Sequence, residues 1–216
     1  MGEMITIITP WLGSPELIPD YEAAVSGAQV IILDNGSDNE TGIALREMVQ
    51  RLGGGYIRND ANRGYAEANN QGLEAASGEV TIFLNNDITA DPGWLDQVGE
   101  SVKSGALYGP SLGMRYVDGA AIAYLEGWCL IGKTDELREI GGWNANAFPG
   151  LYWEDNELCW RAMRHGLSLK QIALPIQHIN NYTSAKTPGA YDNSAKNRAV
   201  FEQIVRHDRE NSHRMQ

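Results

Sequence analysis

The sequence lacks the features that mark membrane and secreted proteins. No apolar run reaches the ~20 residues that a membrane-spanning helix needs. The first ten residues contain no charged segment followed by a long apolar one, so we expect no secretory signal. Only two cysteines are present, Cys129 and Cys159, and both lie in apolar surroundings. Two cysteines are too few for a disulfide framework, and we therefore expect a reduced, cytoplasmic protein without a membrane span.

Positive charge is also scarce. The chain has 17 Lys and Arg against 28 Asp and Glu, which gives a formal net charge of −11. This balance disfavours a basic surface for anionic lipid or nucleic acid, and with it a nucleic acid as a substrate. The segment from Ala185 onward differs, because it carries six basic and four acidic residues. Its mildly basic character hints at a separate contact role.

Two common nucleotide-binding motifs are absent. No G-x-G-x-x-G follows the first apolar run, and no G-x-x-x-x-G-K-[ST] occurs anywhere in the chain. Dinucleotide-dependent enzymes and P-loop NTPases therefore lose their main support in the sequence. The stretch after the first apolar run, residues 9–14 (TPWLGS), also lacks the glycine-rich basic loop typical of sugar nucleotidyltransferases.

The first half of the chain alternates short apolar runs with helical stretches. We predict strands at 4–9, 29–33, 55–58 and 80–84, and helices at 16–26, 40–51 and 64–76. Strands separated by helices of this length form βαβ units with a parallel sheet. The strands are apolar on both faces, as a sheet covered by helices requires. The prediction is an α/β fold with a Rossmann-like, mostly parallel central sheet and flanking helices.

The second half is less regular and indicates a mixed sheet. We expect strands at 107–109, 113–117 and 128–131, an extended segment at 169–176, and helices at about 154–165 and 195–206. Thr134 is expected to cap a short helix that Gly141 and Gly142 end. We divide the chain into one domain at 1–184, with a nucleotide-binding half at about 1–100 and an acceptor and catalytic half at 101–184. A loop-and-helix tail at 185–216 follows.

Polar residues gather where predicted strands of the first half end. Thr9 and Pro10 close the first strand, Asp34 follows the second, and Asn85-Asn86-Asp87 follows the fourth. In open α/β sheets the ligand crevice lies outside the carboxyl ends of the strands. These clusters therefore predict a binding site along one edge of the sheet.

Asp87 and His178 are candidates for a metal site. A carboxylate at the end of a strand can hold a hard divalent cation, which neutralises a diphosphate, and an imidazole can join the same ion. The alternative for residues 85–87 is an Asx turn that leads into the next helix. The alternative for His178 is an ordinary hydrogen-bonding role.

Two further segments have both a structural and a functional interpretation. Glu154 and Asp155 open a helix, where acidic residues complement the helix dipole, but Asp155 is also a candidate general base. Arg63 lies just before another helix, where it suits a phosphate or a nucleobase edge. Arg58 and Arg63 are equally compatible with surface ion pairs, which contribute little to stability.

Several motifs, taken in order, resemble the family-two inverting glycosyltransferases with the GT-A fold, and most closely their rhamnosyltransferase-like branch. They are residues 32–38 (ILDNGSD), 62–72 (NRGYAEANNQG), 84–87 (LNND), 141–144 (GGWN) and 153–161 (WEDNELCWR). The resemblance covers about residues 5–178. It departs from the family pattern at 85–87, where Asn-Asn-Asp replaces the usual Asp-x-Asp, so that one carboxylate remains there.

The resemblance implies transfer of a sugar from a nucleotide-diphosphate donor, such as a UDP-, dTDP- or GDP-sugar, to a hydroxyl group. The acceptor is a saccharide or another hydroxyl compound in polysaccharide or glycoconjugate synthesis, and the cofactor is Mn²⁺ or Mg²⁺. Two alternatives stay open at this point. They are a non-catalytic module that binds sugar nucleotides or carbohydrates and, with less support, a sugar nucleotidyltransferase.

The resemblance also implies a role for each candidate residue. Thr9 and Pro10 would line the nucleotide pocket, and Asp34 and Arg63 would contact the nucleobase. Asn86 lies in the Asp-x-Asp region, where Asp87 would bind the metal together with His178. Asp155 would be the catalytic base, and Glu154 would lie beside it near the donor or acceptor sugar. Trp128 and Trp153 are candidate platforms for a sugar ring, although packing in the core would explain either residue equally well.

Overall fold

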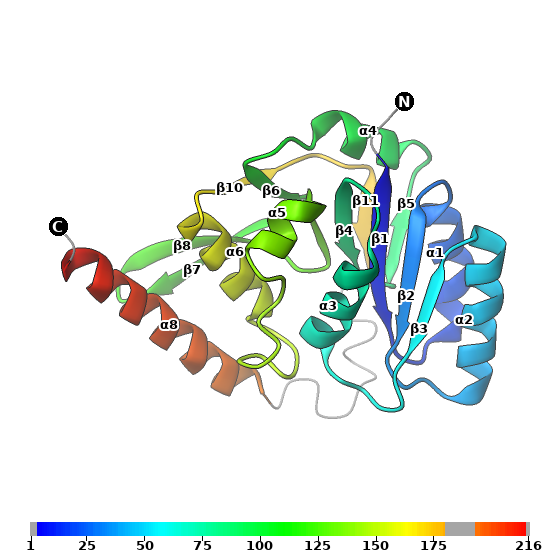
Figure 1. The fold of residues 1–216 in the computed structure, drawn as a ribbon, viewed down its shortest axis with the longest axis horizontal. Coiled ribbons are helices and arrows are strands. Elements are labelled where there is room, and N and C mark those ends of the chain that lie inside the picture. The colour runs from blue at the N-terminus through cyan, green and yellow to red at the C-terminus, as the bar shows by residue number, and fades with distance from the viewer. Residues whose placement is uncertain (1–3, 180–192, 215–216) are drawn as a thin grey trace.

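A seven-stranded sheet runs through the centre of the molecule (Figure 1). The computed structural model describes residues 4–179 and 193–214. In spatial order the strands are β10 (Ser168–Gln171), β6 (Ala106–Gly109), β9 (Cys129–Lys133), β4 (Val80–Leu84), β1 (Ile5–Trp11), β2 (Gln29–Asp34) and β3 (Gly55–Arg58). All of these neighbours pair in parallel except β9, which runs antiparallel to β4 and β6. The predicted α/β fold with a mostly parallel sheet is confirmed.

Helices cover both faces of this sheet, because its strands are apolar on both sides. One face packs against the 3₁₀ helix η1 (Pro15–Leu17), α1 (Ile18–Val25), α2 (Asn39–Leu52) and α4 (Trp94–Ser101). The other face packs against α3 (Tyr65–Ala75), α5 (Thr134–Glu139) and α6 (Glu154–Arg164). Successive residues of β1 show the division, since Ile7 joins the first cluster and Ile8 the second.

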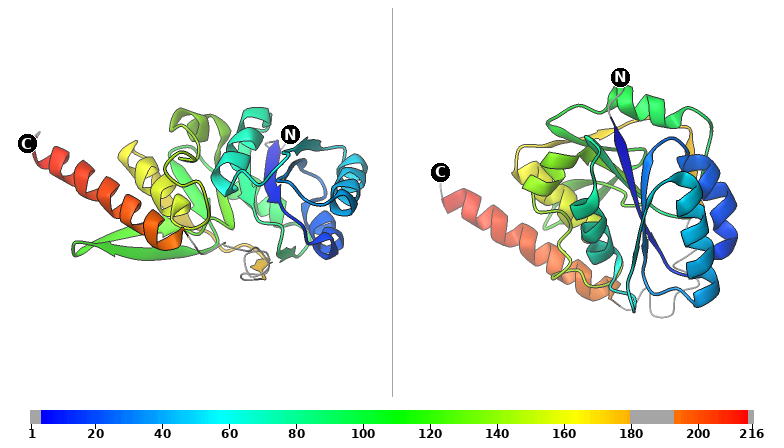
Figure 2. Two further views of the ribbon diagram at one scale, coloured as in Figure 1. Left: turned by 90° about the horizontal axis from the view of Figure 1, so that it is seen from below. Right: turned by 45° about the vertical axis from the view of Figure 1, so that its right-hand side comes forward.

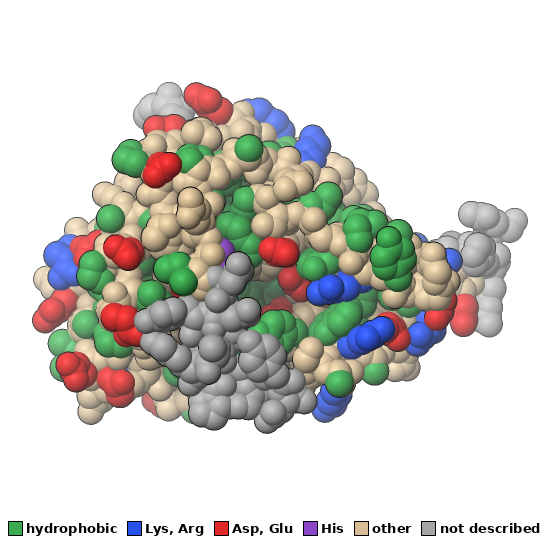
Figure 3. Space-filling view, turned by 180° about the vertical axis from the view of Figure 1, so that it is seen from behind, with side chains coloured by type: hydrophobic (Ala, Val, Ile, Leu, Met, Phe, Trp, Pro, Cys, Tyr) green, Lys and Arg blue, Asp and Glu red, His purple; other side chains and the backbone are tan. Residues whose placement is uncertain are grey.

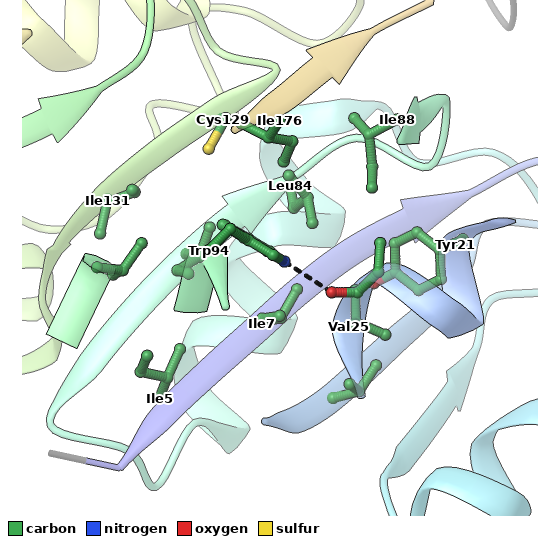
Figure 4. Close-up of a cluster of buried hydrophobic side chains, with 14 of the residues drawn as sticks. Ile5, Ile7, Tyr21, Val25, Leu84, Ile88, Trp94, Cys129, Ile131 and Ile176 are labelled. Carbon is green, nitrogen blue, oxygen red and sulfur yellow. Dashed lines mark hydrogen bonds between the residues drawn. The ribbon is translucent and has the colours of Figure 1, made fainter. Parts of the chain in front are cut away.

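Trp94 anchors α4 to the first of these faces. Its side chain is buried beside Ile7 and Leu84, as Figure 4 shows. The indole N–H donates a 2.7 Å hydrogen bond to the carbonyl oxygen of Ala24 at the end of α1. A buried indole N–H needs such a partner, so the contact lets a large apolar side chain fill the core without leaving a polar group unsatisfied.

A separate hairpin and the last helix lie at the end of the molecule opposite α1 and α2 (Figure 2). The hairpin consists of β7 (Leu112–Val117) and β8 (Ala120–Leu125), and α8 (Ser194–Arg214) packs with α6 against it. The turn residues Asp118 and Gly119 both have positive φ, which fits the tight turn that right-handed twist favours. Phe201 and Val205 of α8 are fully buried in a third apolar cluster with Val117.

A two-stranded sheet apart from the central one fixes the position of His178. Strand β5 (Ile88–Ala90) pairs antiparallel with β11 (Ile176–His178), and the register sets His178 opposite Ile88. His178 therefore comes next to Asp87, which lies one residue before Ile88. The extended segment predicted at 169–176 is divided in the structure between β10 and β11.

The elements predicted in the first half agree with the structure to within two residues at every end, and those of the second half need two corrections. The stretch predicted at 113–117 lies in the hairpin and not in the central sheet, and β8 was not predicted. Thr134 does not cap α5, since Lys133 holds that position. The Thr134 hydroxyl instead donates a 2.6 Å hydrogen bond to the Gly78 carbonyl oxygen, which ties α5 to the chain before β4.

The predicted final helix begins as expected and extends to Arg214. The loop at 185–192 of the predicted tail lies outside the described residues, and the division of the chain at residue 184 stays a prediction. Across 4–179 and 193–214, no helix is long and apolar enough to cross a membrane.

The packing of α8 predicts its contribution to stability. Replacing the fully buried Phe201 with Ala should lower the free energy of unfolding by about 3–5 kcal/mol, because it leaves a cavity between α8 and the hairpin. Gln203→Ala, at an exposed position of the same helix, should change it by less than ~0.5 kcal/mol. Urea unfolding measures both variants. Equal effects would mean that α8 does not pack on the hairpin.

Candidate active site

The central sheet, the hairpin and the turn before α6 together enclose a cleft of about 470 Å³. The side chains that line it include Pro10, Tyr65, Asn85, Asn86, Asp87, Arg115, Tyr124, Glu126, Trp128, Trp153, Glu154, Asp155 and His178. Figure 3 shows a hollow on this side of the molecule with a histidine, acidic side chains and basic side chains in succession. Of the predicted site residues, Pro10, Asn86, Asp87, Glu154, Asp155 and His178 meet in this one cleft.

Asp87 and His178 form a close pair at one end of the cleft. The His178 Nε2 atom lies 3.0 Å from Asp87 Oδ1 and 3.2 Å from Asn85 Nδ2. The imidazole stacks on the indole of Trp128, with ring centroids 5.0 Å apart and planes inclined by 2°. Trp128 in turn donates from its Nε1 to Glu126 Oε2 at 3.1 Å. These contacts fix the orientation of the imidazole beside the carboxylate.

Asp87 and His178 supply one hard oxygen donor and one imidazole nitrogen, a set that suits a divalent cation. The Asp87 carboxylate is nearly inaccessible to bulk solvent, although it borders the cleft. Within the described part of the chain, no group of three or more His, Cys, Asp or Glu side chains gathers in a way that could hold an ion. The pair could therefore hold a cation only if other ligands, such as diphosphate oxygens, completed its coordination.

Glu154 and Asp155 enter the cleft at the first turn of α6, after a strained turn. Tyr152 and Trp153 have φ values of 74° and 78°, a left-handed conformation that is uncommon outside glycine. Asn197 of α8, which is 1% exposed, donates from Nδ2 to the carbonyl oxygen of Tyr152 at 3.0 Å. Such strain persists only where the surroundings over-determine it, and α8 supplies part of that support.

The two carboxyl groups have different partners. Asp155 Oδ2 accepts a 3.1 Å hydrogen bond from the Gly127 amide, and Oδ1 accepts a 2.8 Å bond from the Asn156 amide. Glu154 is 7% exposed, and its buried Oε2 has no hydrogen-bond partner among the described residues. The site therefore holds one carboxylate bonded to two amides beside one with an unsatisfied oxygen.

Burial raises the pKa of both carboxyl groups above that of ordinary carboxylic acids. Desolvation raises the pKa of Asp155 to about 6, and the two amide hydrogen bonds oppose the rise. Desolvation, with repulsion from Asp155, raises the pKa of Glu154 to about 8. At neutral pH Asp155 is therefore ionised while Glu154 keeps its proton, so the cleft offers one base and one neutral donor.

The residues predicted to meet the nucleotide lie near the ends of β1 and β2 and just before α3, and several of them differ from expectation in their contacts. The buried Asp34 accepts hydrogen bonds from the Ser37 amide (2.8 Å), the Tyr56 hydroxyl and the Arg58 guanidinium (2.5 Å). The cation beside Asp34 is thus Arg58. Arg63 is exposed, and its backbone amide donates to the side chain of Asn35 at 3.0 Å.

Thr9, which was predicted to line the nucleotide pocket, instead contacts a buried side chain. Its hydroxyl is fully buried and lies 2.6 Å from the Tyr21 hydroxyl, and the residue does not line the cleft. Gly42 of α2 packs against the Asp34–Arg58 pair, and a Cβ at this position would overlap the Arg58 guanidinium. The nucleobase and nucleotide roles of Thr9, Asp34 and Arg63 stay predictions.

Sequence reasoning missed the residues that the hairpin brings to the cleft. Arg115, Tyr124 and Glu126 lie on β7, on β8 and just after β8, respectively. The available signal was the Asp118-Gly119 dipeptide between two apolar stretches, which is typical of a two-residue hairpin turn.

Comparison with known proteins finds a family model and several relatives that match this chain. A family model described as Glycosyl transferase family 2 matches residues 23–146, more than half of the chain. The matched range includes Asp87 but ends before Glu154, Asp155 and His178.

Two curated relatives and one solved structure are also similar. The pre-mycofactocin glycosyltransferase of Mycobacterium tuberculosis is 22% identical over 197 residues, which cover 77% of this chain and 40% of the relative. The low-salt glycan biosynthesis hexosyltransferase Agl10 of Haloferax volcanii is 24% identical over 216 residues, covering 84% and 68%. The mannosyltransferase PcManGT from Pyrobaculum calidifontis, solved with GDP-Man and Mn²⁺, superposes with a TM-score of 0.65 at 17% identity, covering 80% and 55%. The chain thus spans less than half of the mycobacterial relative.

The raised pKa of Glu154 predicts a pH-dependent stability. The folded state holds the Glu154 proton more tightly than the unfolded state, so folding loses stability as the pH rises from about 4.5 to about 8. Glu154→Gln cannot ionise and should unfold at the same temperature as the wild type at pH 4.5. At pH 8.5 it should unfold several degrees higher, at roughly 2–4 °C for each kcal/mol.

Differential scanning calorimetry at the two pH values measures this difference. The exposed Glu139→Gln is the matched control, and it should follow the wild type throughout. A Glu154→Gln variant whose unfolding temperature differs from the wild type by the same amount at both pH values would contradict the assignment of a buried, protonated Glu154.

Proposed function

This chain belongs to glycosyl transferase family 2, and from that membership we propose that it transfers a sugar, with inversion, from a nucleotide-diphosphate donor to an acceptor hydroxyl. The observation that carries the proposal is the single cleft that joins the Asp87–His178 pair to the buried Asp155. A transfer of this kind needs a group that compensates charge on a leaving diphosphate and a base on the opposite side of the reacting carbon.

Asp155 is proposed as the general base. Its pKa of about 6 lies just below neutral pH, where a base is both ionised and able to accept a proton. Each carboxylate oxygen accepts one backbone amide bond, which leaves further lone pairs for a substrate hydroxyl. In the proposed single displacement, Asp155 takes the proton of the acceptor hydroxyl while the oxygen of that hydroxyl attacks the anomeric carbon. The bond to the diphosphate breaks on the opposite face, which inverts the configuration.

Glu154 is proposed to stay protonated during the reaction. A neutral carboxyl group beside Asp155 adds no second negative charge to the cleft and can donate a hydrogen bond to a sugar oxygen. Its buried oxygen without a partner among the described residues is consistent with a substrate contact.

Asp87 and His178 are proposed to hold Mn²⁺ or Mg²⁺ together with the diphosphate of the donor. When bound, such an ion stabilises negative charge on the leaving diphosphate. Asn86 borders the same end of the cleft. The stacking of Trp128 on His178 would keep the imidazole in place as the donor enters and leaves.

The nucleotide is proposed to lie along the ends of β1 and β2, beside Pro10 and the Asp34–Arg58 pair. Thr9 and Arg63 are proposed to contribute to the same region. UDP-, dTDP- and GDP-sugars are the donors to test, with GDP-mannose and Mn²⁺ first, since a protein of similar fold was solved with both. We propose a hexosyl or deoxyhexosyl donor, a saccharide or other hydroxyl acceptor in polysaccharide or glycoconjugate synthesis, and a cytoplasmic location.

Removing the base should separate turnover from binding. Asp155→Asn keeps the size of the side chain but cannot accept the proton, so donor turnover should fall by about 10²–10⁴-fold. The affinity for the nucleoside diphosphate should stay within a factor of about two to three of the wild type. Release of nucleoside diphosphate measures the first quantity and titration calorimetry the second. Unchanged turnover in this variant would remove Asp155 from the mechanism, and loss of nucleotide binding would make it a binding residue.

Asp87 should control the effect of the metal. In the wild type, a nucleoside diphosphate should raise the unfolding temperature more with Mn²⁺ than with EDTA, since only the folded protein binds the complex. Asp87→Asn should abolish this difference, whereas Asp91→Asn, at an exposed position nearby, should keep it. A full Mn²⁺-dependent shift in the Asp87 variant would place the metal elsewhere.

A further inference from the structure

Arg115 lies in the cleft between two aromatic rings. Its guanidinium carbon is 4.7 Å from the ring centroid of Tyr124 and 4.8 Å from that of Trp153. Gly113 makes this arrangement possible, because a Cβ at that position would overlap the Tyr124 ring across the hairpin. The cation is therefore held in a fixed orientation by contacts with aromatic rings.

The hydrogen-bonding capacity of Arg115 is left unused by the described residues. Its Nε is buried and has no hydrogen-bond partner there, and no ion pair joins Arg115 to a described carboxylate. Arg198, whose guanidinium lies 5.9 Å from the other ring partner Trp153, differs because it pairs with Glu202 at 2.8 Å. A partly buried guanidinium without a partner is costly unless a ligand satisfies it.

The acidic side chains of the cleft accept hydrogen bonds from groups other than Arg115. Both oxygens of Asp155 accept backbone amide bonds, and Glu126 accepts the indole N–H of Trp128. The proton that Glu154 keeps at neutral pH lowers the negative charge of the cleft. The planar fork of Arg115 is thus available to an anion that enters from solvent.

Arg115, Asp155 and His178 contact residues that follow one another along one segment of the chain. The segment from Tyr124 to Trp128 connects them, since Tyr124 stacks on Arg115, the Gly127 amide binds Asp155, and Trp128 stacks on His178. If the donor diphosphate occupies the His178 end, the hairpin end is left for the molecule whose hydroxyl Asp155 deprotonates.

We propose that Arg115 binds an anionic group on the acceptor, so that this enzyme glycosylates an acidic saccharide. The anion is a carboxylate, as in a uronic acid, or a phosphate on the sugar, and it would bind the fork of the guanidinium while Tyr124 and Trp153 hold that fork in plane. This inference rests on the proposed transferase function, because it assigns the end of the cleft that the donor leaves free.

The test measures the binding of three simple saccharides to the full chain. Methyl β-D-glucuronide and glucose 6-phosphate carry the two anions, and methyl β-D-glucoside is neutral. Titrations with Mn²⁺ and a saturating nucleoside diphosphate should show at least one acidic saccharide binding ~10-fold or more tightly than the glucoside, as expected for a bidentate charged contact. Whichever acidic saccharide is preferred identifies the anion as carboxylate or phosphate.

Variants then assign the preference to Arg115. Arg115→Gln should reduce it to about the level of the neutral glucoside, and Arg115→Lys should retain part of it, because a lysine keeps the charge and loses the fork. Lys170→Gln, which removes a cation stacked on Tyr108 outside the cleft, should keep the full preference. Binding is the readout because the charge of Arg115 also lowers the pKa of Asp155 and would change the rate independently.

Two results would overturn the inference. Equal affinities for acidic and neutral saccharides in the wild type would remove the anion site, and an Arg115→Gln variant that loses nucleotide affinity instead would assign Arg115 to the donor diphosphate. Failure of the transferase proposal looks different. In that case the wild type neither binds nor hydrolyses any nucleotide sugar, and the saccharide titrations, repeated without nucleotide, still decide whether Arg115 binds an anion.

Discussion

The removal of two adjacent carboxyl groups from water is the constraint on which the rest of this structure depends. Glu154 and Asp155 cannot both ionise cheaply in a buried site, so their pKa values rise and one proton stays bound at neutral pH. Two backbone amides offset part of this cost by donating hydrogen bonds to Asp155. The strained turn at 152–153 directs the first turn of α6 into the cleft. The resulting pKa of Asp155, near neutral, is what the base of the proposed transfer requires.

The hairpin and α8 complete the cleft at the end that lies away from β2 and β3 (Figure 1). The hairpin contributes Arg115 and Tyr124, and α8 supports the turn before α6 through Asn197 and Phe201. The central sheet alone would present Asp87 at a strand end, as many α/β proteins present a polar residue. The elements of the second half extend that strand end into a cleft, where charges are less screened by water than on an open surface.

Much of the first half was predictable because its apolar runs are long, regular and separated by clear helices. The structure brings Asp87, Glu154, Asp155 and His178 into one cleft, although they are far apart in the sequence, and their roles stay predictions. The pairing of β7 with β8 in a separate hairpin was not predicted. Residues 112–117 alternate exposed and partly buried side chains, and only Asp118-Gly119 marks the turn. Local pattern also could not foresee that Thr134 would bind Gly78 or that Arg58 would lie beside Asp34, because both contacts depend on tertiary packing.

The pH dependence of donor turnover, measured with saturating nucleotide sugar and Mn²⁺, tests the central claim most directly. If the buried Asp155 is the base, the rate rises with pH and reaches half of its plateau near pH 6, where that carboxyl group loses its proton. A rate that is constant between pH 5 and 7.5, in protein shown to remain folded over that range, would contradict the account, since it would mean that no buried carboxylate accepts the proton.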